Sequence, residues 1–182
     1  MKIVALVGSI RKESVNMQIA KTIQERYEEQ TEIEIADISS LPYYDQDQEL
    51  NPPQAVQDFK SAIAQADGVI IITPEYNWSV PGVLKNALDW ASRVEREFIG
   101  KPVMILGASP GAVGTVRAQL HLRDILSSPG LQAKVLPPGS NEILINFVND
   151  KLDTEKGRLK DEATLNFIDG KINNFFNFVK SC

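Results

Sequence analysis

Short apolar runs alternate along the chain with longer segments in which apolar side chains recur every three or four positions. A short, β-branched-rich run bounded by turn residues is typical of a buried strand, whereas a spacing of three to four residues predicts an amphipathic helix. The pattern therefore predicts strands that alternate with helices. The predicted strands are residues 2–7, 32–38, 68–73, 102–106 and, with a weaker pattern, 132–136.

Five helices are predicted between and after these strands. Ser14 and Asn16 are candidate caps of the first, and prolines open the second and third. Strand–helix alternation indicates an open, doubly wound α/β sheet that forms one domain over residues 1–182. Residues 41–53 and 137–154 are predicted to be long loops. The apolar positions that define the helices include Ile19, Ile23, Tyr27; Val56, Phe59, Ile63; Val83, Leu84, Leu88; Val116, Leu120, Leu126; and Leu165, Ile168, Ile172, Phe175 and Val179.

Composition narrows the classes of function. The 182 residues carry a net charge of −5, which argues against non-specific nucleic-acid binding. One histidine and one cysteine cannot build a zinc cage. The acidic loop at Asp45, Asp47 and Glu49 is interpreted as a solvated face, with an unsupported hard-cation site as the alternative, and no metal is predicted. The lone Cys182 fits a reducing compartment. The N-terminal apolar run is too short for a signal peptide or a membrane helix, so we expect a soluble, cytoplasmic protein.

The loop after the first strand, GSIRKESVN at residues 8–16, combines features that suit a phosphate. Ser9, Ser14 and Asn16 offer hydrogen-bonding groups, and Arg11 adds a cation. A helix starts within the segment, so its free N–H groups and its dipole favour an anion there. The alternative is a helix cap beside a solvated arginine. The loop is neither a dinucleotide G-x-G-x-x-G motif nor a P-loop.

The loops after the third and fourth strands suggest a place for a flat ring, because ligands of open α/β sheets bind at the carboxyl ends of the strands. Tyr76 and Trp78 would form a wall for such a ring, or would pack under a neighbouring subunit. Glu75 is interpreted as fixing its own loop rather than as a general base. Residues 107–115 are small and uncharged, which suits either close backbone approach to a ligand or a compact turn.

A serine hydrolase is the main rival suggested by a motif. Residues 107–111 match G-x-S-x-G between a strand and a helix. Pro110 follows Ser109, however, and has no N–H for an oxyanion hole. The only histidine, His121, lies on the next helix, and no acidic residue stands between it and Ser109. We therefore reject acyl transfer and interpret His121 as a surface or packing residue.

Over residues 1–136 the sequence resembles the NADPH-dependent FMN reductase family, which includes quinone, chromate and azo-dye reductases. The resemblance rests on GSIRKESVN, on PEYNWSVPGVLKNALDW at residues 74–90, and on the small loop before Arg117-Ala118-Gln119. It implies a flavodoxin-like fold with five parallel strands in the order 2-1-3-4-5 and helices on both faces.

The resemblance also implies the roles of individual residues. Ser9, Arg11, Ser14 and Asn16 would hold the FMN phosphate. The isoalloxazine and ribityl chain would lie along Pro74, Glu75, Tyr76 and Asn77, and the third loop would touch the ring through Ser109 and Gly114. Members often carry Gly-Gly before Arg-Ala-Gln, whereas this chain has Gly114-Thr115, which adds a side chain to the ring-contacting loop.

The function implied is an FMN-dependent oxidoreductase that moves hydride from NADPH or NADH through bound FMN to a quinone, azo dye, flavin or similar flat acceptor. FMN carries the chemistry, so no catalytic side chain is expected. The sequence does not distinguish NADPH from NADH. A homodimer or homotetramer would form through the helix around Val83 and Trp90, with Lys85 and Asn86 at the interface. The alternative is a non-enzymatic, flavodoxin-like FMN electron carrier.

Overall fold

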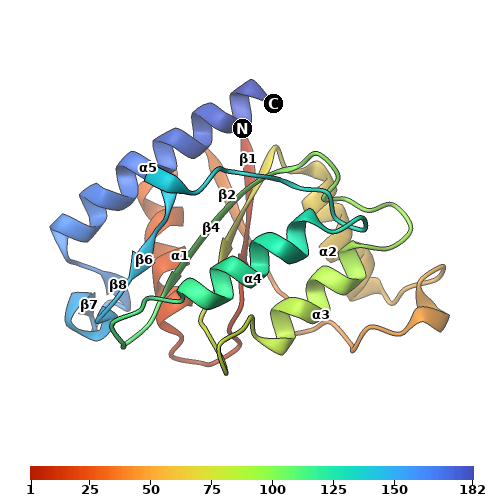
Figure 1. Cartoon of the computed structure of the whole chain (residues 1–182), viewed down its shortest axis with the longest axis horizontal. Coiled ribbons are helices and arrows are strands. Elements are labelled where there is room, and N and C mark those ends of the chain that lie inside the picture. Colours follow the sequence, from red (N-terminus) through yellow and green to blue (C-terminus); the bar gives the residue numbers. More distant parts are fainter.

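The strands form one parallel sheet in the computed structural model, which describes residues 1–182 (Figure 1). The strand order β2-β1-β3-β4-β5 is the predicted one, and β2, in which charged and apolar residues alternate, lies at an edge. Compared with the prediction, β2 ends two residues earlier and β4 two residues later, so Gly107 and Ala108 belong to a strand and not to the following loop. The strands are β1 Lys2–Val7, β2 Glu32–Ala36, β3 Gly68–Ile72, β4 Pro102–Ala108 and β5 Lys134–Val135.

Helices cover both faces of the sheet. Side chains of a strand point alternately to its two faces, so Ile3 and Ala5 of β1 pack with α1 and α5, while Val4 and Leu6 pack with α2, α3 and α4. This is the doubly wound arrangement that the alternation predicted. The helices are α1 Val15–Arg26, α2 Gln54–Gln65, α3 Gly82–Ala91, α4 Val116–Ser127 and α5 Glu162–Ser181. None of them combines the length and the apolarity that crossing a membrane requires.

The edge beyond β4 is shared by two short strands. β5 pairs with the start of β4, and β6 (Leu144–Ile145) pairs in parallel with its end, at Gly107 and Ala108. Between them lies a short 3₁₀ helix, η2 (Gly139–Asn141). The strand predicted at residues 132–136 is confirmed as the shorter β5, whereas the prediction of a loop at 137–154 was wrong, because η2 and β6 lie in it and are too short to show a periodicity.

The chain after β6 makes a small hairpin beside α1. A 3₁₀ helix, η3 (Val148–Lys151), leads into β7 (Leu152–Asp153), which pairs antiparallel with β8 (Arg158–Leu159). The N–H of Leu159 donates to Thr22 Oγ1 of α1 at 3.0 Å. The hairpin lies at the lower left of Figure 1, at the same end of the molecule as the loops that follow β1 and β4.

Polar contacts fasten α5 to α1 on the same face. The guanidinium of Arg26 donates two hydrogen bonds to Asp169, at 2.7 and 2.6 Å, and the hydroxyl of Tyr27 donates a third at 2.6 Å. The Arg26 contact, together with the Tyr27 hydroxyl, holds the pKa of Asp169 below its ordinary value. The C-terminal helix is therefore an integral layer of the fold.

Candidate functional site

A cavity of about 240 Å³ opens at the carboxyl ends of β1, β3 and β4. We call it the strand-end cavity. It brings together eight of the ten residues that the sequence predicted, from three separate loops, while Asn77 and Gly114 lie outside its lining. Its walls are Ser9, Arg11, Ser14, Val15, Asn16, Pro74, Glu75, Tyr76, Ala108, Ser109, Pro110 and Asn149.

The first loop presents donors for an anion. Ser14 caps α1, because its hydroxyl accepts from the N–H of Met17 at 3.2 Å. The N–H groups of Val15 and Asn16 have no partner within the protein. Arg11 is exposed beside them. Free N–H groups, the positive end of the helix dipole and a guanidinium thus meet at one wall of the strand-end cavity, which is the chemistry of a phosphate site.

Asn16 has a different role from the predicted cap. Its Nδ2 donates to the carbonyl of Ala108 at 3.1 Å, and the N–H of Ala108 donates to its Oδ1 at 2.9 Å. Both residues are about 1% exposed. The prediction of Asn16 as a cap was wrong, because its amide bridges the first turn of α1 to the end of β4.

Glu75 fixes the loop that follows β3 to the start of α4. Its Oε2 accepts from the N–H groups of Arg117 and Ala118, at 2.8 and 3.1 Å, and its Oε1 lies 3.6 Å from the Arg117 guanidinium. The residue before α4, Thr115, makes no side-chain cap, so Glu75 supplies that cap from another loop. The loop-fixing interpretation of Glu75 is confirmed.

The rest of this loop is a tight turn. Tyr76 and Ser79 exchange two backbone hydrogen bonds of 3.0 Å, and the two residues between them, Asn77 and Trp78, have φ of 49° and 64°. Positive φ at both central positions is the type I′ geometry of a two-residue hairpin. Asn77 therefore sits at the tip of the turn, while Tyr76 stays on the strand-end cavity, 49% exposed.

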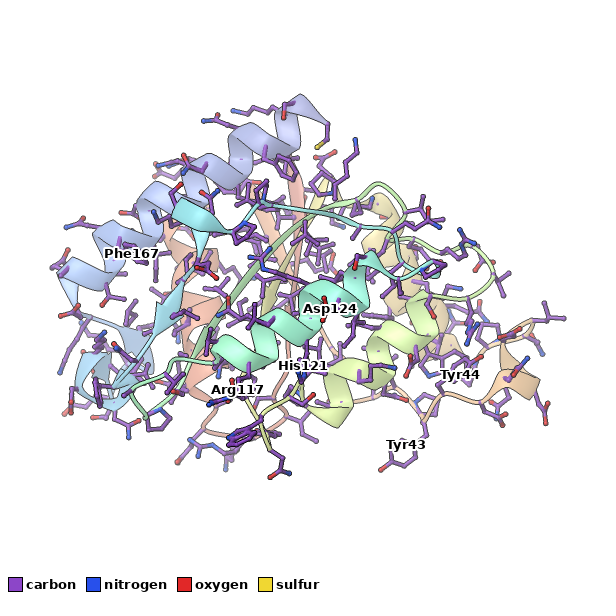
Figure 2. The ribbon with its side chains drawn as sticks, in the orientation of Figure 1. Tyr43, Tyr44, Arg117, His121, Asp124 and Phe167 are labelled. Carbon is purple, nitrogen blue, oxygen red and sulfur yellow. The ribbon has the colours of Figure 1, made fainter.

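Two side chains of α4 hold this turn from outside. The Arg117 guanidinium lies 4.6 Å from the centre of the Trp78 ring, a cation–π contact. One turn further along α4, Nδ1 of His121 lies 3.1 Å from the hydroxyl of Ser79 (Figure 2). His121 is exposed and contacts Ser79, whereas Ser109 donates its hydroxyl to the carbonyl of Gly111 at 3.2 Å. The G-x-S-x-G serine and the histidine are thus engaged separately.

The side chain of Thr115 points into the protein. It is 2% exposed, and Gln119 donates to its hydroxyl at 3.1 Å. A Cβ built on Gly107 of β4 would lie 2.1 Å from that hydroxyl, so Thr115 fills the space that the missing side chain leaves. Thr115 has φ of 115°, an unusual conformation for a β-branched residue. Thr115, which stands where members of the family often have a second glycine, therefore adds a buried side chain that does not obstruct the strand-end cavity.

Asn149 is a wall residue that sequence reasoning missed. It lies on η3, after β6, in the segment that was predicted to be a loop. Nothing in the local sequence marks it, because its place depends on β6 adding to the sheet beside Ala108.

Comparison with known proteins identifies the family. The profile of the NADPH-dependent FMN reductases matches residues 1–149. A relative described as NADH-dependent flavin reductase subunit 2, from Lactobacillus johnsonii, is 40% identical over 99% of this chain and 98% of its own. A quinone reductase of Escherichia coli is 39% identical over 99% of this chain and 96% of its own.

Solved structures of similar proteins agree with this family assignment. The flavoenzyme NAD(P)H:(acceptor) oxidoreductase of Paracoccus denitrificans superposes with a TM-score of 0.88 at 33% identity, and the match covers 99% of this chain and 97% of that one. An FMN-bound azoreductase of Bacillus anthracis, at 14% identity and a TM-score of 0.64, shares the fold. The chain therefore belongs to the NADPH-dependent FMN reductase family.

Proposed function

We propose that this protein uses FMN to oxidise NAD(P)H and to reduce a flat acceptor such as a quinone, a flavin or an azo dye. The observation that carries the proposal is the strand-end cavity, in which an anion-binding helix start and the aromatic ring of Tyr76 line one space, while Trp78 lies outside its lining. FMN, when bound, supplies the hydride chemistry. Its family membership and the names of its relatives, a quinone reductase and a flavin reductase among them, support this assignment.

The residues present fit FMN. Arg11, the hydroxyls of Ser9 and Ser14 and the two free N–H groups at the start of α1 would bind its phosphate. Pro74, Glu75 and Tyr76 would lie along the ring and the ribityl chain, and Ser109 would approach from the third loop. Contacts from Asn77 and Gly114 remain predictions, as does a single FMN-binding domain over residues 1–182. The one carboxylate that lines the strand-end cavity, Glu75, is bonded to the start of α4, so protons would come from solvent.

The direct test is an anaerobic titration of the FMN-loaded protein. We expect it to be yellow and to lose its visible flavin absorbance on addition of NADPH or NADH. A colourless protein that does not take up added FMN would contradict the proposal. Slow or absent bleaching by both nucleotides, with reduction only by a separate reductase, would favour the electron carrier instead.

Arg11→Ala tests the phosphate assignment. We expect the affinity for FMN to fall by roughly 10- to 150-fold, since a charge-assisted hydrogen bond is worth about 1.5–3 kcal/mol. Riboflavin has no phosphate, so its affinity should change by less than about twofold. Fluorescence titration with both flavins measures the two affinities. Equal losses for FMN and riboflavin would show that Arg11 acts on the loop and not on the phosphate.

We further propose a cytoplasmic homodimer or homotetramer. The interface was predicted to form through the helix around Val83 and Trp90. Most apolar side chains of this helix, α3, are buried in the core of the protomer, Leu84 and Leu88 among them. An interface here would therefore use exposed apolar residues near α3. Trp78, in the turn before α3, is 69% exposed, and Leu120 on α4 is 52% exposed. Sedimentation velocity would detect the assembly.

A further inference from the structure

A second and larger hollow adjoins the strand-end cavity. Its volume is about 550 Å³, within the range of small-molecule sites. One wall is the first loop with the first turns of α1, and the other is the hairpin β7–β8, so we call it the hairpin cleft. It shares Arg11, Ser14, Val15 and Asn149 with the strand-end cavity, so the two cavities are neighbours at the proposed phosphate position.

The hairpin cleft is positively charged, although the protein as a whole carries a net charge of −5. Five basic side chains line it and only two acidic ones, Glu13 and Glu155. Of the five, only Arg158 has a carboxylate within 4.0 Å, and its partner is Glu25. The other four cations, Arg11, Lys12, Lys21 and Lys156, have no such partner.

The hairpin wall is held firmly in place. Asp153 accepts from the N–H groups of Glu155 and Lys156 at 3.0 Å, and these bonds keep the pKa of its carboxyl below the ordinary value. Arg158 pairs with Glu25 on α1 and donates to the carbonyl of Gly157 at 2.9 Å. The backbone that carries Lys156 is therefore fixed relative to Lys21 on α1, as a binding site requires.

The position of the hairpin cleft suggests what binds there. The hairpin cleft adjoins the strand-end cavity, so a dinucleotide with one half at that cavity can place its other half in the cleft, where unpaired cations meet the hydroxyl of Thr154 and the amide of Gln18. The second wall lies beyond residue 149, outside the segment that the family profile matches. One relative is described as NADH-dependent and another as NAD(P)H-dependent, so the family alone does not fix the donor.

We propose that the hairpin cleft binds the phosphorylated adenosine portion of a dinucleotide whose other half occupies or faces the strand-end cavity. This inference rests on the proposed function. The dinucleotide that we expect to supply this portion is NADPH. Lys21 and Lys156 would hold its 2′-phosphate, which would make NADPH the preferred hydride donor. The AMP half of FAD, bound in place of FMN, carries the same chemistry and is the second source.

The test uses the FMN-loaded Lys21→Gln/Lys156→Gln protein, because neither lysine lines the strand-end cavity. The matched control is Lys134→Gln/Lys180→Gln, which removes the same charge from exposed lysines outside the cleft. Anaerobic stopped-flow reduction gives the ratio of kcat/KM for NADPH over NADH, and flavin fluorescence gives the ratio of the affinities for FAD and FMN. We expect the donor ratio to fall about tenfold in the cleft variant and to stay unchanged in the control.

Each outcome has one meaning. A lower donor ratio assigns the cleft to NADPH, and a lower FAD-to-FMN affinity ratio with an unchanged donor ratio assigns it to FAD. If both ratios are unchanged while the protein still binds and reduces FMN, the hairpin cleft proposal is overturned and the proposed function stands. If the wild-type protein neither binds FMN nor reacts with a nicotinamide nucleotide, the proposed function itself fails.

Discussion

Gly107→Ala is expected to destabilise the protein by more than about 4 kcal/mol, and to lower its Tm by roughly 10 °C or more. The new Cβ would lie 2.1 Å from the hydroxyl of Thr115 and 2.2 Å from the backbone carbonyl of Thr73. Neither atom can move cheaply. Thr115 is buried and bonded by Gln119, and Thr73 donates its N–H to Leu106 of β4 at 2.9 Å. Thermal and urea unfolding would measure the loss.

Gly170→Ala is the matched control for this substitution. Gly170 lies inside α5, and a Cβ there would meet nothing within 4 Å. The same chemical change should therefore stabilise the protein, by about 0.5–1 kcal/mol, through helix propensity. A loss below about 1 kcal/mol for Gly107→Ala would show that β4 and the start of α4 are not packed as closely as the structure has them.

A double-mutant cycle tests whether positions 107 and 115 act as a pair. In the double variant Gly107→Ala/Thr115→Gly, one of the two close contacts disappears and the strained φ of residue 115 passes to a glycine. Its stability should recover part of the loss, whereas the contact with the Thr73 carbonyl remains. A positive coupling energy in this double-mutant cycle would confirm that the two positions act as a pair.

The fold was predictable because its signals are local. β1, β3 and β4 are mostly apolar runs, β2 alternates apolar and charged residues, and each helix shows its own periodicity, so the order of elements follows from the sequence. The two-residue strand β5 carries only a weak signal and β6 carries none, since pairing with β4 defines them. Asn149 was missed for the same reason, because its position depends on that pairing and not on its neighbours in sequence.

The sequence predicted which loops form the site, but not the hydrogen bonds that join them to the rest of the fold. The rule that ligands bind at the carboxyl ends of parallel strands located the walls of the strand-end cavity. The bonds from Glu75 to the start of α4 and from Asn16 to Ala108 join residues 42, 43 and 92 positions apart, and one sequence gives no register between such distant positions. Asn is a preferred helix cap, so the sequence suggested that role for Asn16, whereas its side chain bonds the backbone of β4.

Asn16→Ala is expected to cost about 2–5 kcal/mol of stability, because it leaves the N–H and the carbonyl of Ala108 buried without partners. Ala108 and the start of α1 both line the strand-end cavity, so flavin affinity should fall as well. Urea unfolding of the apoprotein measures the first effect and fluorescence titration the second. Asn173→Ala is a suitable control, since Asn173 is exposed on α5 and its change should stay within about 0.5 kcal/mol.

Comparing FMN with riboflavin in the same variant separates two roles of Asn16. If its amide acts only by holding α1 against β4, Asn16→Ala should weaken both flavins by the same factor, because the displaced walls serve the whole ligand. If the amide also binds the phosphate, FMN should lose more than riboflavin. Both polar atoms of the Asn16 side chain are already bonded to Ala108, so we expect the affinities for FMN and riboflavin to fall equally. In Arg11→Ala, by contrast, only the affinity for FMN should fall. A selective loss of FMN in Asn16→Ala would contradict this assignment and make Asn16 a phosphate ligand.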